Sequence, residues 1–408
     1  MKTRIAFGTF AAVWIVVIAL GIFVWLRHSQ RIVLPDGTKL TLAAVTYGKH
    51  HEFPGLKIAR ARFNTATDVL CVWIREDFTN ASPGDYTACA LDKSGAFCAG
   101  HASVQRYPAG KGEDIACLRL NVFPRRDGQI RLQIEADDSQ GGTRLMNDEF
   151  VVTFPAQKSS AEWQPQPLPA TEGDGDLTVT LTKLVYGVSF QHPKNTVTSD
   201  PMDKAVQAVF RVEQNGVIAT NWRPGRIESW DATGNHSFSG PRKNRRDGDE
   251  DVLIYQWGLS PDEPAWKLRA EFVRTSGFAP DELWTVAGIP VSTNAVSRRN
   301  RRSDLTGAFA SKKTGDSTVA VFPAGPGDNP GQVRLHVSVD PPPSEDLNFT
   351  LVEMTDDGGK KIRPVNLSRI GGNFNYTFRD GGTKTLAATF ALQGGRFVEF
   401  TVKPEISK

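Results

Sequence analysis

Residues 41–48 read TLAAVTYG and residues 180–187 read TLTKLVYG, an offset of 139 positions. The stretches LDKSG (91–95) and WDATG (230–234) repeat this offset. Downstream, each copy ends on an apolar stretch that closes with proline, EFVVTFP (149–155) and ELWTVAGIP (282–290). Because these landmarks occur in the same order, they predict an internal duplication.

The duplication makes specific predictions about which residues correspond. Aligning residues 59–73 with 208–222 pairs Arg62 with Arg211 and Trp73 with Trp222. We therefore expect Tyr47 to overlie Tyr186, and Trp73 to overlie Trp222. Asn215-Gly216 predicts a two-residue hairpin turn in the second copy. A third unit is indicated by MTDDGGK (354–360) at the turn position and RFVEFTVKP (396–404) at the end, although it lacks the Tyr-Gly landmark.

Apolar residues alternate along several stretches, as in AVQAVFRVE (205–213) and VRLHVSV (333–339). Period two, β-branched residues and turn signals every eight to twelve residues are typical of antiparallel β-sandwiches. The predicted fold class is therefore all-β, with an N-terminal transmembrane helix followed by two to three tandem immunoglobulin-like sandwich units. Cys71 and Trp73 depart from the spacing of a true immunoglobulin domain, because only one residue separates them.

The composition shifts divide the chain into seven segments. In order they are an N-terminal stub (1–4), a transmembrane anchor (5–26), a first unit (36–155), a Pro-rich linker (156–175), a second unit (176–291), a basic linker (292–304) and a third unit (305–404).

Ile5 to Leu26 form 22 residues without a charge. At a rise of 1.5 Å per residue this run spans roughly 33 Å, enough for a bilayer core of about 30 Å. A cleaved signal peptide and a buried soluble helix are the alternatives, but signal peptides have shorter apolar cores and a small-residue cleavage site. Basic residues flank both ends, so charge does not orient the anchor. We expect a single-pass protein of the cell membrane whose remaining chain is extracytoplasmic, and periplasmic in a Gram-negative bacterium.

The stretch VLPDGTKLTLAAVTYGKHHEF, directly after the anchor, resembles the start of bacterial single-pass membrane-anchored proteins that carry an LPDGT…VTYG β module. The resemblance covers about 20 residues and implies no known activity.

All four cysteines lie in the first unit. Cys89 and Cys98 flank a turn, and a two-residue loop at Lys93 and Ser94 would place them opposite each other, close enough for a disulfide. A type I turn with a bulge at Gly95 would instead place them on opposite faces. We predict a Cys89–Cys98 staple with a Cys71–Cys117 bond, and fully reduced thiols as the alternative. Either bond would support an oxidising, extracytoplasmic location.

Net charge is close to neutral, with 48 Lys and Arg against 45 Asp and Glu. This balance predicts no nucleic-acid partner. Two local basic clusters could bind an anionic polymer or an acidic protein, because arginine forks suit carboxylate, phosphate and sulfate groups. A solvated loop and a plain linker are the alternative interpretations. The cluster residues are Arg242, Lys243, Arg245 and Arg246 in the second unit, and Arg298, Arg299, Arg301 and Arg302 in the linker.

Motifs for catalysis or for cofactor binding are missing from the sequence. It contains no nucleophile elbow, zinc-protease helix motif or phosphate-binding glycine loop. His50 and His51 would point to opposite faces of a strand and so could not easily share a metal ion. The acidic runs at 172–176 and 247–251 lack the Glu that a hand-type calcium loop needs. We predict no cofactor, no metal and no enzyme activity.

The sequence therefore favours a membrane-tethered, extracytoplasmic binding or assembly protein that acts through its β units. One alternative is the ectodomain of an envelope sensor or assembly complex. Another is a hydrolase of envelope polymers, with carboxylates that converge between units.

Overall fold

The structure is a computed structural model. It describes residues 30–54, 61–78, 86–91, 97–98, 103–137, 143–157, 162–189, 204–239, 243–255, 259–291, 305, 307–314, 316–327, 329–341, 347–370, 372–379 and 381–407. The predicted stub and anchor lie outside these residues, as does the predicted basic linker. Among the described residues, no helix has the length and apolar character needed to cross a membrane.

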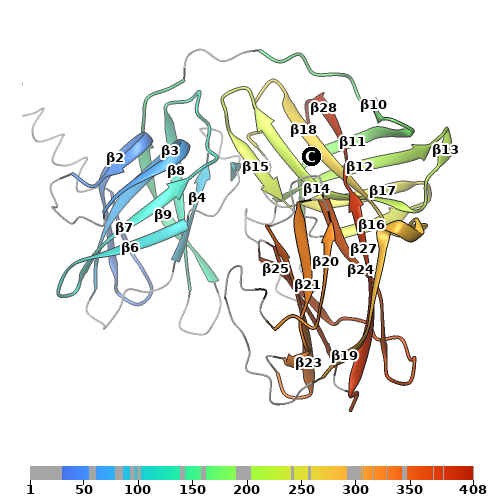
Figure 1. The fold of residues 1–408 in the computed structure, drawn as a ribbon. Coiled ribbons are helices and arrows are strands. Elements are labelled where there is room, and N and C mark those ends of the chain that lie inside the picture. The colour runs from blue at the N-terminus through green and yellow to red at the C-terminus, as the bar shows by residue number, and fades with distance from the viewer. Residues whose placement is uncertain are drawn as a thin grey trace, which may run out of the picture.

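The described chain is all-β and folds into three sandwiches, each made of two sheets (Figure 1). The first unit comprises β1 to β9, the second comprises β10 to β18 together with β28 and β29, and the third comprises β19 to β27. Each unit encloses its own apolar core. The predicted fold class is confirmed in its β-sandwich part.

The first unit pairs a five-stranded sheet, ordered β1-β2-β3-β7-β6, with a four-stranded sheet, ordered β5-β4-β8-β9. The order β2-β3-β7-β6 in the first sheet and β4-β8-β9 in the second is that of an immunoglobulin sandwich, in which A-B-E-D faces the C, F and G strands. β1 and β5 each add one edge strand. Its strands are β1 (Arg31–Val33), β2 (Lys39–Glu52), β3 (Arg62–Asp77), β4 (Tyr86–Leu91), β5 (Phe97–Cys98), β6 (Ser103–Gly110), β7 (Glu113–Leu120), β8 (Gln129–Asp137) and β9 (Thr143–Thr153).

The second unit repeats this order, with sheets β10-β11-β12-β17-β16 and β15-β14-β18-β28. Two short strands extend the first sheet, β13 beside β12 and β29 beside β11. The strands are β10 (Ala170–Asp174), β11 (Leu177–Ser189), β12 (Lys204–Gln214), β13 (Val217–Ile218), β14 (Trp222–Asp231), β15 (His236–Ser239), β16 (Lys243–Asp247), β17 (Glu250–Tyr255), β18 (Trp266–Arg274), β28 (Arg396–Val402) and β29 (Glu405–Ile406). A short 3-10 turn, η2 (Pro280–Glu282), follows β18.

The third unit has sheets β20-β21-β23-β26-β25 and β19-β27-β24, so its second sheet has three strands. The strands are β19 (Leu283–Pro290), β20 (Ala310–Thr314), β21 (Ser317–Val321), β22 (Gly325–Pro326), β23 (Gln332–Asp340), β24 (Leu347–Asp356), β25 (Asn366–Ile370), β26 (Asn373–Arg379) and β27 (Thr385–Gly394). β22 pairs with β23 outside the main strand order.

The second and third units exchange their last strands. β19, which follows β18 in sequence, pairs with β27 of the third unit. β28, which follows β27, returns to pair with β18 of the second unit (Figure 1). This corrects the predicted boundaries, because residues 283–290 belong to the third unit and residues 396–402 to the second.

The two cores confirm the exchange. Val286 and Ile289 of β19 are buried in the core of the third unit. Val398 and Phe400 of β28 are buried in the core of the second unit. Only Gly395 separates β27 from β28, and a side chain there would approach Glu271 Oε1 to 2.9 Å. The glycine therefore allows the chain to pass directly from one sandwich into the other.

The predicted duplication is correct in topology, but only some of the predicted residue correspondences hold. Tyr47 and Tyr186 lie at the same place in equivalent strands, each beside a bulge. Trp73 and Trp222 do not correspond, because Trp73 lies in β3 and Trp222 begins β14. Asn215 and Gly216 form the predicted hairpin turn, both with positive φ, between β12 and β13.

The linker between the first two units is shorter than predicted. Residues 170–174 form β10, which pairs with β11, instead of an extended connection. The acidic run at 172–176 is therefore a strand and its hairpin turn. The run at 247–251 likewise lies at the turn between β16 and β17.

Candidate functional site

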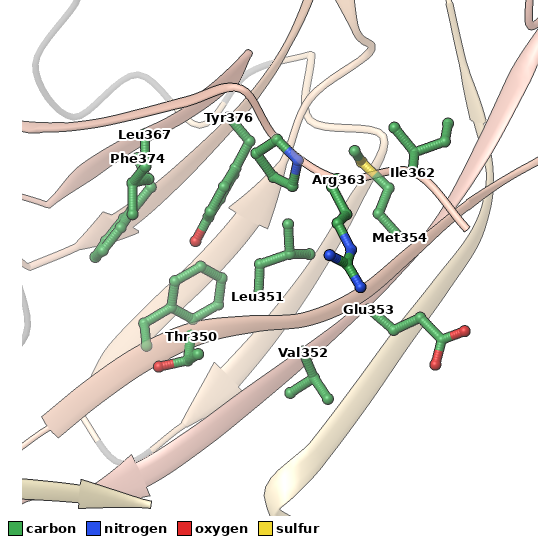
Figure 2. A pocket seen from close by; sticks show the side chains of 12 residues that line it. Thr350, Leu351, Val352, Glu353, Met354, Ile362, Arg363, Leu367, Phe374 and Tyr376 are labelled. Carbon is green, nitrogen blue, oxygen red and sulfur yellow. The ribbon is translucent and has the colours of Figure 1, made fainter. Parts of the chain in front are cut away.

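The third unit contains an apolar groove of about 510 Å³ at one open edge of its sandwich. β24 forms one wall, and the segment 362–364 with Leu367 forms the other. Figure 2 shows Leu351 in the middle of the groove, with the ring of Tyr376 on one side of it and Arg363 extending across from the other.

The floor of the groove is built from aromatic rings that belong to the core. Phe349 packs at 5.0 Å between ring centroids against both Phe374 and Phe390. Phe349, Phe374 and Tyr376 are each at most 5% exposed, so the floor is held by core packing. Leu367, by contrast, is 56% exposed at the rim. Rigid apolar floors with a few polar groups at the rim are typical of binding sites in this range of volume.

The local sequence explains why this edge is open. The turn at 356–360 is closed by Asp356, whose Oδ1 accepts hydrogen bonds from the backbone N–H groups of Gly358 and Lys360. The chain then forms one bridge, Thr355 to Lys361, and a hydrogen bond from Ile362 N–H to Met354 O. Pro364 cannot donate a backbone hydrogen bond, and the chain crosses to the other sheet as β25. The predicted turn at MTDDGGK is therefore confirmed, and the strand after it is reduced to a bridge.

The first and second units meet through a buried polar network. The Arg125 guanidinium donates from Nε to Asn235 Oδ1 at 2.8 Å, from Nη2 to Asp68 O at 2.9 Å, and from Nη1 to the Tyr47 hydroxyl at 3.3 Å. Asn235 Nδ2 donates in turn to Phe123 O at 2.8 Å. A cavity of about 490 Å³ lies beside this junction. Because the Arg125 guanidinium makes these hydrogen bonds at the junction, it is not available to bind a ligand in this cavity.

The two carboxylates at this junction, Glu263 and Asp231, already have partners within the protein. Glu263 is paired with Arg126 at 3.1 Å, and burial raises its pKa, with a further increase from nearby Asp231. Asp231 closes its own turn by accepting hydrogen bonds from Thr233 and Asn235. This arrangement is not a pair of carboxylates that faces an open cleft.

The predicted Cys89–Cys98 staple is wrong in register. β5 pairs Cys98 with Ala90 and Phe97 with Leu91, which is the register of the alternative turn. Cys98 is therefore not the cross-strand partner of Cys89. Cys89 is buried, and its Sγ donates to Gln133 O at 3.7 Å.

The predicted Cys71–Cys117 bond is also absent, and both residues are buried free thiols. The register pairs Cys71 with Arg119 and Cys117 with Trp73, so the cysteines are diagonal neighbours. Diagonal neighbours are typically about 7–8 Å apart, beyond the range of about 4.4–6.8 Å that a disulfide tolerates between Cα atoms. A hydrogen bond with Cys117 and burial raise the pKa of the Cys71 thiol.

The described part of the basic cluster in the second unit is a strand, not an exposed loop. Lys243, Arg245 and Arg246 lie in β16, and Arg246 Nη1 is 3.9 Å from Asp251 Oδ2. Asp251 also pairs with Arg223 at 2.8 Å. Arg242 and the cluster Arg298, Arg299, Arg301 and Arg302 lie outside the described residues, and their anion binding stays a prediction.

His50 and His51 point to opposite faces, as the strand geometry predicted. His51 is buried, and its ring nitrogens lie 2.9 Å from Thr46 Oγ1 and 2.9 Å from Gly48 O. Burial lowers its pKa. Within the described residues no group of three metal-ligating side chains comes together.

Sequence reasoning missed the groove. No local motif marks the groove. It lies beside β24, where the described residues form a single bridge instead of a neighbouring strand. The nearest signal is Pro364, six residues after Gly358, which limits how far a strand could continue after the turn.

No protein-family model and no curated protein matches the chain. Among solved structures, a three-domain immunoglobulin structure of titin in an E-to-A mutated variant is 8% identical, covers 90% of this chain and 100% of its own, and has a TM-score of 0.13. A marsupial T cell receptor is 10% identical, covers 89% of this chain and 99% of its own, and has a TM-score of 0.14. The fold assignment therefore rests on the strand order observed in this chain.

Proposed function

We propose that this protein is a membrane-tethered, extracytoplasmic binding protein that captures a protein partner in the groove of its third unit. The observation that carries the proposal is the open apolar groove. Val352, Val365 and Leu367 at or beside its rim are 41%, 54% and 56% exposed. Apolar side chains that cluster in this way on one edge are typical of interaction sites.

The sequence supports the tether. The uncharged run from Ile5 to Leu26 is long enough for a membrane anchor. Three sandwiches in tandem would hold the groove away from the bilayer, and binding needs none of the catalytic motifs that the sequence lacks.

Site-specific photo-crosslinking in intact cells tests the proposal. A photoreactive amino acid at position 352 should give a discrete covalent adduct with another protein. The same amino acid at position 217, which is 69% exposed on a hairpin of the second unit, should give none. Protease added to spheroplasts should digest the three units.

Three results would contradict the proposal. Position 352 could give no adduct, or the same adducts as position 217, and the groove would then not be a binding site. Protection of the three units from external protease would refute the extracytoplasmic location.

A further inference from the structure

From the geometry of β24 we infer that the groove binds its partner by strand addition: an extended peptide with alternating apolar residues and one carboxylate pairs with the free edge of β24. This inference rests on the proposed function and specifies the class of partner.

The first argument comes from the other two units. The strand equivalent to β24 is β4 in the first unit and β14 in the second. β4 pairs with β5 at Ala90 and Leu91, and β14 pairs with β15 along residues 227–230. In the third unit the described residues give this edge only the bridge at Thr355. The fold therefore accommodates a strand at this position, and the described part of the third unit supplies almost none of it.

The second argument is the state of the edge. β24 pairs with β27 from Leu347 to Asp356, and its other side has no strand partner among the described residues before the bridge. The ladder shifts between Leu351 and Glu353, so Val352 is a bulge residue. Bulges and charged side chains protect edges from pairing. The bulge and the ion pair between Glu353 and Lys361, at 3.3 Å, therefore protect the end of β24 and leave residues 347–351 open.

The third argument concerns side chains. In a strand, alternate residues point to the same face. A strand beside residues 347–351 would place every second side chain over the aromatic floor, near Leu351 and Tyr376. The side chains that lie over this aromatic floor should therefore be apolar. Backbone hydrogen bonds would supply affinity and the floor would select the side chains, as in other strand-addition complexes.

The fourth argument is charge. Arg363 is exposed at the rim and forms no ion pair with any described residue. Its guanidinium extends toward β24 across the groove (Figure 2). A guanidinium in this position suits a carboxylate of the incoming strand, which can accept two parallel hydrogen bonds.

A peptide array tests the inference with the purified full-length chain in detergent. The probes are eight-residue peptides in which apolar residues alternate with threonine, each with one glutamate at a varied position. Every peptide has two matched controls, one with glutamine in place of glutamate and one N-methylated at alternate amides. N-methylation removes backbone donors and keeps the side chains.

The inference predicts that the alternating peptides bind and that N-methylation on the pairing edge weakens binding at least tenfold. Binding should slow amide exchange in residues 347–351. Arg363→Gln should weaken binding of the glutamate peptides several-fold and leave binding of the glutamine peptides unchanged. Lys313→Gln, on β20, is the matched control variant and should change neither.

Three results would overturn the inference. The array could bind no alternating peptide, or N-methylated peptides could bind equally well, which would leave only side-chain contact with the groove. Alternatively, the chain could be a dimer that Val352→Lys converts to a monomer, and the occupant would then be a second copy. An adduct at position 352 with another protein, combined with either of the first two results, would leave the proposed function standing and reject strand addition.

Discussion

At the scale of single residues, buried carboxylates show how ion pairs and desolvation compete in this protein. Glu76 is fully buried in the first unit, and Arg106 Nε lies 3.1 Å from both of its oxygens. Burial nevertheless raises the pKa of Glu76 above its ordinary value, although Arg106 opposes the shift. Burial also raises the pKa of Asp251 in the second unit, against two arginines. In both pairs desolvation outweighs the neighbouring cations in setting the pKa of the carboxyl group.

The raised pKa of Glu76 predicts a pH dependence of stability. The folded state binds the proton more tightly than the unfolded state. The stabilising contribution of Glu76 is therefore complete below its unfolded pKa of about 4.3 and is lost as pH rises through the folded pKa. In Glu76→Gln this contribution does not titrate. The free energy of unfolding of Glu76→Gln relative to wild type should rise between pH 4 and 7, by at most about 1.4 kcal/mol per pH unit.

Urea unfolding at a series of pH values measures this difference. The substitution Arg106→Gln should extend the decline of stability to higher pH, because loss of the opposing cation raises the folded pKa of Glu76 further. A difference between Glu76→Gln and wild type that stays constant from pH 4 to 7 would show that burial does not control this carboxylate.

At the scale of elements, the exchange of β19 and β28 is the main feature of the fold. β19 completes the sheet beside β27, and β28 completes the sheet beside β18. Further contacts bind the crossing point. Gln393 Nε2 donates to Arg274 O at 2.8 Å, and Arg396 pairs with Asp176 at 3.1 Å. The last strand of the second unit, β28, therefore comes after all strands of the third unit in the sequence.

A truncation distinguishes exchanged strands from strands kept within their own units. A chain that ends at Gly394 lacks β28 and β29 and retains β19. Val398, Phe400 and Val402 each contribute about 1.5–3 kcal/mol of burial, so their loss should unfold much of the second unit. Hydrogen exchange should accelerate in β18, which pairs with β28, and remain slow in β27.

A chain that ends at Lys403 is the matched control, because it loses only β29. It should keep slow exchange in both β18 and β27. If the chain that ends at Gly394 instead loses protection in β27 and keeps it in β18, each unit retains its own last strand and the exchange is wrong.

At the scale of the whole molecule, two kinds of junction connect the three sandwiches. The second and third units are joined by exchanged strands, whereas the first and second meet through side chains around Arg125 and Asn235. Asn235 is 1% exposed and Arg125 is 4% exposed. Such a network can be removed without unfolding either unit, so the first junction should be the weaker one.

Asn235→Ala tests the strength of this junction. Across the junction, the substitution leaves the Arg125 Nε donor and the backbone N–H and carbonyl of Phe123 without their Asn235 partner, which should cost about 1–3 kcal/mol of docking free energy. It also removes the bond from Asn235 Nδ2 to Asp231 Oδ2 within the second unit. Scanning calorimetry should then resolve the first unit as a separate, earlier transition, and small-angle scattering should report a larger radius of gyration. Asn244→Ala, whose amide bonds only within the second unit, should change neither measurement. An unchanged single transition in Asn235→Ala would mean that the network does not hold the units together.

The local sequence by itself determined that the chain is β, where its turns lie and that its units repeat. Val206, Ala208, Phe210 and Val212 alternate and are all buried, because a half-buried strand needs that period. Asn215-Gly216 predicts its turn because both residues tolerate positive φ. Tyr47 and Tyr186 revealed the duplication because they recur in equivalent strands of the two units.

Only the tertiary structure decided which strand completes which sheet. EFVVTFP, ELWTVAGIP and RFVEFTVKP carry equivalent patterns, so each could fill the same place, and the path of the chain between sandwiches selects among them. The thiols show the same limit on a smaller scale, because one residue of register moves Cys98 from facing Cys89 to facing Ala90. The groove lies where the described residues provide β24 with no second strand partner. The lack of a neighbouring strand leaves no pattern in the sequence of β24 itself.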